Sequence, residues 1–230
     1  MCTAIAKNGN DLIYGFNFDV DPEKWPYKVV KTKNYFGIGI TLGSTTYLVH
    51  GINKEGHFGN SLYMNGEDFV AQKGKKRMRI DLLNDRFVRG KYSFDDVEKI
   101  IDECEIINNK NTNLHSLIGN ENGEYLLVEP GYGIKRIKEN FAVLTNFPVL
   151  TKLNDYSNPF FGKDRYDHAL KVLKKSKDNY SVKDAYKLLE ETKQDGKWGT
   201  RVSFVYSKNE NKVYYCLDGN FSDINVHQFI

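Results

Sequence analysis

The stretch MCTAIAKNGNDLIYGFNFD, residues 1–19, decides the fold predicted for this chain. Its two apolar halves flank Asn8-Gly9-Asn10, a turn sequence typical of a β-hairpin. Asp19 ends the second half, so we expect its carboxylate to return close to Cys2. The chain is therefore predicted to open with a hairpin that brings an acid back to a thiol.

Cys2 is a candidate nucleophile because it follows the initiator methionine. Its side chain is small enough to permit removal of that methionine, which would leave a thiol and a free α-amine on one residue. An α-amine titrates near ~7.7–8.0 and a thiol near ~8.5, so the amine can accept the thiol proton at neutral pH. This is the N-terminal variant of an activated nucleophile. Taken alone, the residue also fits an arbitrary second position in a chain without catalytic function.

Composition bounds the class of protein. With 230 residues, of which 40% are hydrophobic and 13% aromatic, the chain can bury the core of a large domain. No repeat, low-complexity run or linker divides it, so we predict a single domain over residues 1–230. Its 33 basic and 30 acidic residues are interleaved and give a net charge of +3, which argues against nucleic-acid binding. The basic cluster at residues 73–79 is interpreted as a solvated linker.

Cysteine and histidine spacing indicates no metal and no cofactor. Cys2, Cys104 and Cys216 form neither a disulfide framework nor a zinc motif. Cys104 falls on the apolar face of a predicted helix and Cys216 in an apolar strand, so both are interpreted as buried structural thiols. The five histidines show no metal-ligand spacing, and a pairing of Cys2 with one of them stays open.

Targeting signals are absent from the sequence pattern. The first residues lack the basic region, apolar run and cleavage site of a signal peptide. No stretch approaches the roughly 20 apolar residues of a membrane span. We therefore expect a cytoplasmic protein without membrane insertion.

Hydrophobic periodicity predicts strands, helices, strands, helices and strands in turn. Strands are expected at residues 2–8, 11–19, 27–32, 35–42, 45–52, 57–65, 114–119, 125–129, 134–137, 141–145, 201–207 and 212–217. Helices are expected at residues 80–88, 94–104, 163–175 and 182–191. Ser93 and Ser181 precede the second and fourth helices as capping boxes. This order favours an α+β fold in which helices cover antiparallel sheets.

Two polar residues stand where strands end. Asp19 is placed to hold an α-ammonium or to orient Cys2, although an ordinary surface aspartate fits the same pattern. Asn146 follows the apolar run at residues 141–145. A side-chain amide there can donate a hydrogen bond to a developing oxyanion. From the local sequence alone, a turn-forming asparagine is the better interpretation.

A larger set of motifs occurs in a fixed order along most of the chain. In that order they are Met1-Cys2-Thr3, Gly15-Phe16-Asn17-Phe18-Asp19, His50-Gly51-Ile52-Asn53-Lys54-Glu55-Gly56, Ser61-Leu62-Tyr63, Leu144-Thr145-Asn146-Phe147-Pro148, Asp164-Arg165-Tyr166 and Gly199-Thr200-Arg201-Val202-Ser203-Phe204-Val205-Tyr206. Together they resemble the choloylglycine hydrolase and penicillin V acylase family of N-terminal-nucleophile hydrolases. The last motif is similar to the isopenicillin N acyltransferase and acid amidase branch. Each motif is weak alone, and their order makes the signal specific.

The resemblance implies an αββα sandwich of two antiparallel sheets between two helical layers. It implies that Cys2 is the nucleophile and, through its α-amine, the general base. Asp19 would orient these groups and Arg165 would supply positive charge beside them. The side-chain amide of Asn146 and the backbone N–H of Tyr63 would form the oxyanion hole.

The motif that begins at His50 is similar to the family's Asp-Gly-x-Asn-x-x-Gly. The sequence departs from the family pattern in two places, and in the first of them Phe16 stands where the family has arginine. The segment between Asn146 and Arg165 is short compared with the bile salt hydrolases. Tyr63 occupies a position that is tyrosine in typical penicillin V acylases and asparagine in typical bile salt hydrolases. The resemblance at this position therefore argues against bile salts as substrates.

The resemblance implies a linear amide C–N hydrolase acting on a small-molecule N-acyl amide, without a cofactor, and closer to penicillin V acylase than to bile salt hydrolase. Two alternatives stay open at this point. One is an acyltransferase that uses the same Cys2 thioester, and the other is a catalytically silent binding protein on this fold. The acyl and amine groups and the formation of a homo-oligomer are not decided by the sequence.

Overall fold

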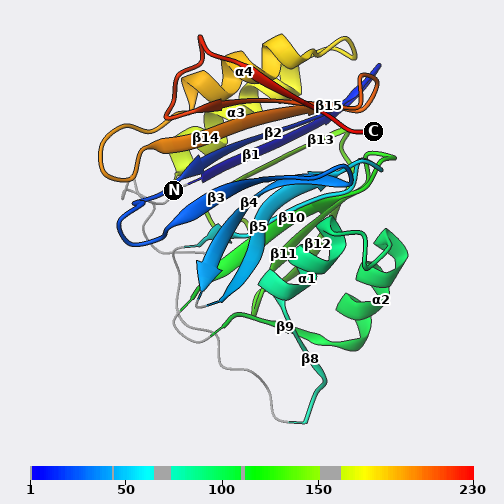
Figure 1. Ribbon diagram of the computed structural model, residues 1–230. Helices are drawn as coiled ribbons and strands as arrows, with labels where there is room; N and C mark the ends of the chain where they lie inside the picture. Colours follow the sequence, from blue (N-terminus) through cyan, green and yellow to red (C-terminus); the bar gives the residue numbers. More distant parts are fainter. Residues whose placement is uncertain (1, 43, 65–73, 110–111, 151–161) are drawn as a thin grey trace.

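The computed structural model describes residues 2–42, 44–64, 74–109, 112–150 and 162–230. Two large antiparallel sheets lie face to face, and a pair of helices covers the outer face of each (Figure 1). The layers therefore follow the order helix, sheet, sheet, helix. This architecture confirms the predicted α+β class and the αββα sandwich.

The N-terminal hairpin lies at the centre of a six-stranded sheet with strand order β13-β1-β2-β14-β15-β16. Its strands are β1 (Cys2–Asn8), β2 (Leu12–Asp19), β13 (Phe141–Thr145), β14 (Thr200–Ser207), β15 (Lys212–Leu217) and β16 (Asn225–Gln228). Cys2 pairs with Phe18 across the hairpin, and Thr3 pairs with Thr145 on the other side. This register places Asn146, the residue after β13, beside the first residue of β1.

The second sheet has the strand order β12-β11-β10-β6-β5-β4-β3, with β7 paired to β10. Its strands are β3 (Tyr27–Lys31), β4 (Tyr35–Leu42), β5 (Thr45–Asn53), β6 (Phe58–Asn60), β7 (Leu62–Tyr63), β10 (Leu114–Gly119), β11 (Tyr125–Glu129) and β12 (Gly133–Ile137). The strand expected at residues 57–65 is interrupted at Ser61, where the chain leaves β6 and enters β7. Residue 65 lies outside the described residues.

All four predicted helices are confirmed. Helices α1 (Ile80–Val88) and α2 (Phe94–Glu103) cover the eight-stranded sheet, and α3 (Lys163–Lys175) and α4 (Val182–Glu191) cover the six-stranded one. Ser93 and Ser181 form the expected capping boxes, with Asp96 and Asp184 completing them. Within the described ranges, none of the helices is long and apolar enough to cross a membrane.

Three short strands were not expected from the sequence. Besides β16, these are β8 (Arg77–Arg79) and β9 (Glu105–Ile107), which pair in parallel. The interpretation of the basic cluster as a linker is therefore wrong for Arg77–Arg79, because its backbone pairs with β9. Lys73, in the same cluster, lies outside the described residues. A strand with charged side chains has no apolar face for hydrophobic periodicity to detect. Its stability comes from main-chain pairing instead.

Cys104 also differs from the prediction. It caps the C-terminus of α2 in an extended conformation instead of continuing the helix, and it is half-buried. The chain must leave the helix there because Glu105 begins β9. Cys216 is buried in β15 between the sheet and the helices, as predicted.

Alternation along the central strands fills two separate cores. Ala4, Tyr14 and Phe16 point between the two sheets, where Tyr14 stacks on Phe58 with ring centroids 4.0 Å apart. Ile5 and Ile13 point to the opposite face and pack beneath the helices. Because both faces of this sheet are covered, β2 is buried along its whole length.

Candidate active site

Cys2 begins β1 with its side chain directed between the two sheets, in the same cluster as Ala4. Only 6% of the residue is exposed, and Sγ lies 3.9 Å from the carbonyl oxygen of Asp19. Burial raises the pKa of the Cys2 thiol to about 11. The thiol is therefore protonated at neutral pH, and a reaction at Sγ requires a base nearby.

Asp19 lies at the end of β2, where the pairing with β14 is irregular between Thr200 and Val202. This irregularity sets Thr200 opposite Asp19, and its hydroxyl donates to Oδ1 at 2.6 Å. Burial raises the pKa of Asp19 to about 6, although positive charge at the N-terminus and on Arg165 and the Thr200 hydrogen bond act to lower it. Asp19 is therefore a carboxylate at neutral pH that titrates well above its usual range.

Arg165 reaches the start of β1 from the first turn of α3, and it is 4% exposed. Nη1 donates to the Cys2 carbonyl at 2.6 Å and to the Thr3 hydroxyl at 2.9 Å, and it lies 3.8 Å from Asp19 Oδ2. Gly162, the residue before the helix, has φ +67°, and a Cβ there would lie 2.4 Å from Arg165 Nη2. A glycine is required at that point, because the guanidinium packs directly against its backbone.

Two donors fix the orientation of the Asn146 side chain. Cys2 N donates to Oδ1 at 2.6 Å, and Arg165 Nη2 donates to the same oxygen at 3.2 Å. Nδ2 is consequently turned the other way and donates to the Tyr63 carbonyl at 2.5 Å. An amide nitrogen carries two N–H bonds, so a second donor remains on Nδ2 beside that contact.

Tyr63 presents its main chain to Asn146. Met64 N donates to Asn113 O at 2.8 Å, and Tyr63 is the next residue back along β7, paired with Leu114. In an antiparallel ladder the N–H and C=O groups of successive residues alternate between the two edges of a strand. The N–H and C=O of Tyr63 therefore both face away from β10 and toward Asn146.

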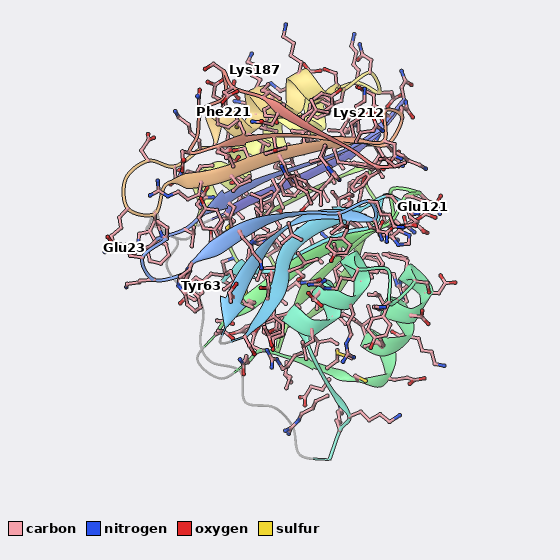
Figure 2. The ribbon with its side chains drawn as sticks, in the orientation of Figure 1. Glu23, Tyr63, Glu121, Lys187, Lys212 and Phe221 are labelled. Carbon is pink, nitrogen blue, oxygen red and sulfur yellow. The ribbon has the colours of Figure 1, made fainter. Side chains whose placement is uncertain are left out.

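The structure thus brings together all five residues expected from the sequence, from β1, β2, β7, the end of β13 and α3. Cys2, Asp19, Tyr63 and Asn146 line a cavity of about 490 Å³, and Arg165 contacts Cys2 and Asn146 without lining it. Its apolar and aromatic lining residues are Phe18, Val20, Trp25, Ile40, Tyr47, Val49, Leu114 and Trp198. Tyr63 lines the same cavity, and 55% of it is exposed at the edge of the molecule (Figure 2).

Phe16, which departs from the family pattern, contacts His50 in this site. The ring of Phe16 lies against that of His50, with centroids 4.0 Å apart, and His50 also lines the cavity. Burial, together with positive charge at the N-terminus, holds the pKa of His50 well below its usual value. A neutral aromatic pair therefore occupies the two positions at which the family pattern has arginine and aspartate.

Sequence reasoning missed several supporting residues. Thr200 and Thr3 lie inside recognised motifs, yet only the fold shows that they hold Asp19 and Arg165. Trp198 lines the cavity from a turn whose local sequence carries no signal for it. Among the described residues, no three His, Cys, Asp or Glu side chains lie close enough together to hold a metal ion.

Two facing antiparallel sheets with helices on both outer faces form the sandwich of the N-terminal-nucleophile hydrolase fold. A family model for linear amide C–N hydrolases of the choloylglycine hydrolase family matches residues 3–168. The chain belongs to this family, and it is a linear amide C–N hydrolase. Among curated proteins, none matches the chain.

Solved structures share the fold at low sequence identity. A cysteine-to-alanine mutant of the conjugated bile acid hydrolase from Clostridium perfringens is 15% identical, with a TM-score of 0.72 over 99% of this chain and 92% of that one. Penicillin V acylase from Agrobacterium tumefaciens is 14% identical, with a TM-score of 0.60 over 98% and 84%. The Caenorhabditis elegans ortholog of N-acylethanolamine-hydrolyzing acid amidase is 12% identical, with a TM-score of 0.61 over 90% and 93%. At these identities the likeness extends to the fold alone.

Proposed function

We propose that Cys2 is the nucleophile of a hydrolase that cleaves a linear, non-peptide N-acyl amide. The observation that carries the proposal is the shared acceptor on Asn146. Cys2 N and Arg165 both donate to Oδ1, which turns Nδ2 toward the main chain of Tyr63 beside the nucleophile. An amide nitrogen and a backbone N–H directed to one place form an oxyanion hole.

The mechanism requires that Cys2 be the first residue of the mature chain, so that its nitrogen is an amine. The amine keeps an N–H for Asn146 Oδ1 and uses its lone pair to take the thiol proton. Sγ then attacks the substrate carbonyl carbon, and the carbonyl electron pair moves onto oxygen. Asn146 Nδ2–H and Tyr63 N–H stabilise this oxyanion.

Collapse of the intermediate breaks the C–N bond. The α-ammonium donates its proton to the departing nitrogen, which leaves as an amine, and the acyl group stays on Sγ as a thioester. The amine then takes a proton from water as the water attacks the thioester. Release of the carboxylic acid restores the thiol, so that atoms and protons balance over the cycle.

The lowered pKa of His50 argues against that residue as the base, which leaves the α-amine of Cys2 for this role. Burial disfavours a free thiolate, so proton transfer is expected to accompany attack on the carbonyl. His50 lines the same cavity, but its pKa is held well below its usual value, which makes it a weak base. Asp19 is an anion at neutral pH, and its proposed role is to hold the α-ammonium that forms.

The cavity indicates the class of acyl group. Most of its lining is apolar, and Trp25, Tyr47 and Trp198 contribute aromatic surface. Such a lining stabilises an apolar or aromatic acyl chain by burial. The proposed kinship with penicillin V acylase rests on Tyr63, because fold likeness does not distinguish substrates.

A substrate panel tests this function. Penicillin V, a glycine-conjugated bile acid and an N-acylethanolamine are each incubated with the protein, and the released acid and amine are quantified. We expect amide hydrolysis by the unmodified chain, fastest with penicillin V, and none by Cys2→Ala. Alanine also permits methionine removal, so this variant tests the thiol alone. Hydrolysis that survives in Cys2→Ala would refute the proposal. Transfer of the acyl group to an added amine, without free acid, would instead identify an acyltransferase.

A further inference from the structure

A buried histidine–glutamate pair lies behind the proposed oxyanion hole. His115 is in β10 and Glu129 is in β11, and both side chains are fully buried. His115 Nδ1 lies 3.2 Å from Glu129 Oε1. Burying two ionisable groups is costly unless each is paired and fully hydrogen-bonded, so the surroundings of this pair decide what it does.

Hydrogen bonds join the pair to the main chain on either side of Asn146. His115 Nε2 lies 2.7 Å from the carbonyl oxygen of Thr145, the residue directly before Asn146. Glu129 accepts from the backbone N–H of Val149 at 2.6 Å and of Leu150 at 2.8 Å. The pair therefore holds the main chain both before and after Asn146.

The hydrogen bonds of the pair fix the orientation of the imidazole. The Thr145 carbonyl can only accept, so Nε2 of His115 carries a hydrogen and Nδ1 faces Glu129. Although burial raises it, the hydrogen bond and charge of His115 and the N–H groups of Val149 and Leu150 hold the pKa of Glu129 below its usual value. The Glu129 carboxylate is thus held between His115 and two main-chain N–H groups by charge-assisted hydrogen bonds.

This pair also connects the two sheets. His115 and Glu129 belong to the eight-stranded sheet, whereas Thr145 ends β13 of the six-stranded sheet. Asn146 Nδ2 donates to the Tyr63 carbonyl of the eight-stranded sheet, and its Oδ1 accepts from Cys2 N of the six-stranded sheet. A shift of the Thr145 carbonyl would consequently displace the Asn146 amide relative to Tyr63.

We propose that His115 and Glu129 are positioning residues that set the location of the Asn146 amide in the oxyanion hole. This inference rests on the proposed function, since it assigns to the pair an effect that acts only through Asn146. A displacement of about 1 Å at a catalytic group can cost about 10²-fold in rate. Loss of the charge on Glu129 should therefore lower kcat more than it changes KM.

A double-mutant cycle tests the proposal. Steady-state kinetics are measured for the unmodified chain, Glu129→Gln, Asn146→Ala and the double variant. We expect Glu129→Gln to lower kcat about 10- to 10²-fold with KM changed less than about threefold. In the Asn146→Ala background the same substitution should lower kcat less than about threefold, because residues that act through one group are not additive.

Glu121→Gln is the matched control. Glu121 contacts His57 at 2.6 Å in another histidine–glutamate pair, at the end of the molecule opposite Tyr63 (Figure 2). The kcat of Glu121→Gln should stay within about twofold of that of the unmodified chain. If Glu129→Gln does not fold, Glu129→Asp replaces it in the cycle, since aspartate keeps the charge but is one methylene shorter.

The outcomes separate this inference from the proposed function. Full activity in a folded Glu129 variant, or an equal loss of kcat with and without Asn146, would overturn the positioning role. Full activity in Asn146→Ala would instead refute the proposed oxyanion hole, and the inference with it.

Discussion

Two buried thiols in the same sheet differ in almost everything except burial. Cys2 lies in β1 and Cys216 in β15, and burial raises the pKa of each thiol to about 11. Cys2 points between the two sheets and lines the cavity. Cys216 points to the other face of its sheet, among the apolar residues beneath α3 and α4.

The difference shows that burial alone does not set the two thiols apart. Cys2 has Arg165 on its carbonyl, Asn146 on its nitrogen and the Asp19 carbonyl near Sγ. Cys216 has Ser203 opposite it on β14 as its hydrogen-bonding neighbour. Charged groups, an oriented amide and access to a cavity therefore mark the site, and each can be removed separately.

The largest effect is expected from Cys2→Ala. Removal of the nucleophile should lower kcat by more than about 10⁴-fold, because nothing else at the site forms the thioester. Circular dichroism should show an unchanged fold, since alanine already occupies the same face of β1 at Ala4 and Ala6. Substantial amide hydrolysis by a folded Cys2→Ala protein would contradict the assignment.

Asn146→Ala should lower kcat by about 10²- to 10³-fold, the loss typical of one oxyanion-hole donor. The control is Asn209→Ala, because Asn209 donates its amide to the exposed turn at Asn10 instead. Its kcat is expected within about twofold of the unmodified chain. Equal activities of the two variants would show that the amide of Asn146 does not stabilise the transition state.

Asp19 should control the acidic limb of the pH–rate profile. Activity is expected to rise with pH through about 6, where Asp19 ionises. Asp19→Asn should remove this limb and lower the plateau of kcat/KM by about 10- to 10²-fold. A limb near pH 6 that persists in Asp19→Asn would assign it to another group.

For Asp19, the free energy of unfolding and the activity should depend on pH in opposite directions. Asp19→Asn should therefore lose activity without losing stability. A raised pKa means that the folded state binds the Asp19 proton more tightly than the unfolded state does. The free energy of unfolding therefore falls as pH rises through about 6. At pH 7, Asp19→Asn should unfold at a denaturant concentration no lower than the unmodified chain.

The smallest effect on activity is expected from Cys216→Ala. Its kcat should stay within about twofold, while the free energy of unfolding falls by about 1 kcal/mol because a packed side chain is shortened. Urea unfolding and steady-state kinetics on one preparation measure both quantities. A loss of activity as large as that of Asn146→Ala would remove the distinction between the two thiols.

Periodicity predicted the elements that have an apolar face. The hairpin of β1 and β2, all four helices and most strands appear where the sequence indicated, because these segments bury patterned side chains. Periodicity did not predict strands β8, β9 and β16, because they are three or four residues long and are held by main-chain pairing. The end of α2 at Cys104 likewise depends on the partner of the following strand, which local sequence does not reveal.

The residues predicted for the site lie close together in the structure, and each could be proposed because its motif is contiguous in the sequence. Asp19 and Asn146 lie at strand ends beside Cys2, and the register of the sheet brings them together. His115 and Glu129 carry no such signal, because their partners are the main-chain groups of Thr145, Val149 and Leu150. Main-chain partners do not depend on side-chain identity, so only the fold discloses the pair.

The central claim is that the amine and the thiol of Cys2 act together, and an intact-mass measurement tests it most directly. Active protein is weighed before and after brief treatment with iodoacetamide, and peptide mapping locates the adduct while activity is followed. The account predicts a chain shorter by one methionine, an adduct on Cys2, parallel loss of activity and an unmodified Cys216. Fully active protein that retains Met1, or activity that survives complete alkylation of Cys2, would contradict it.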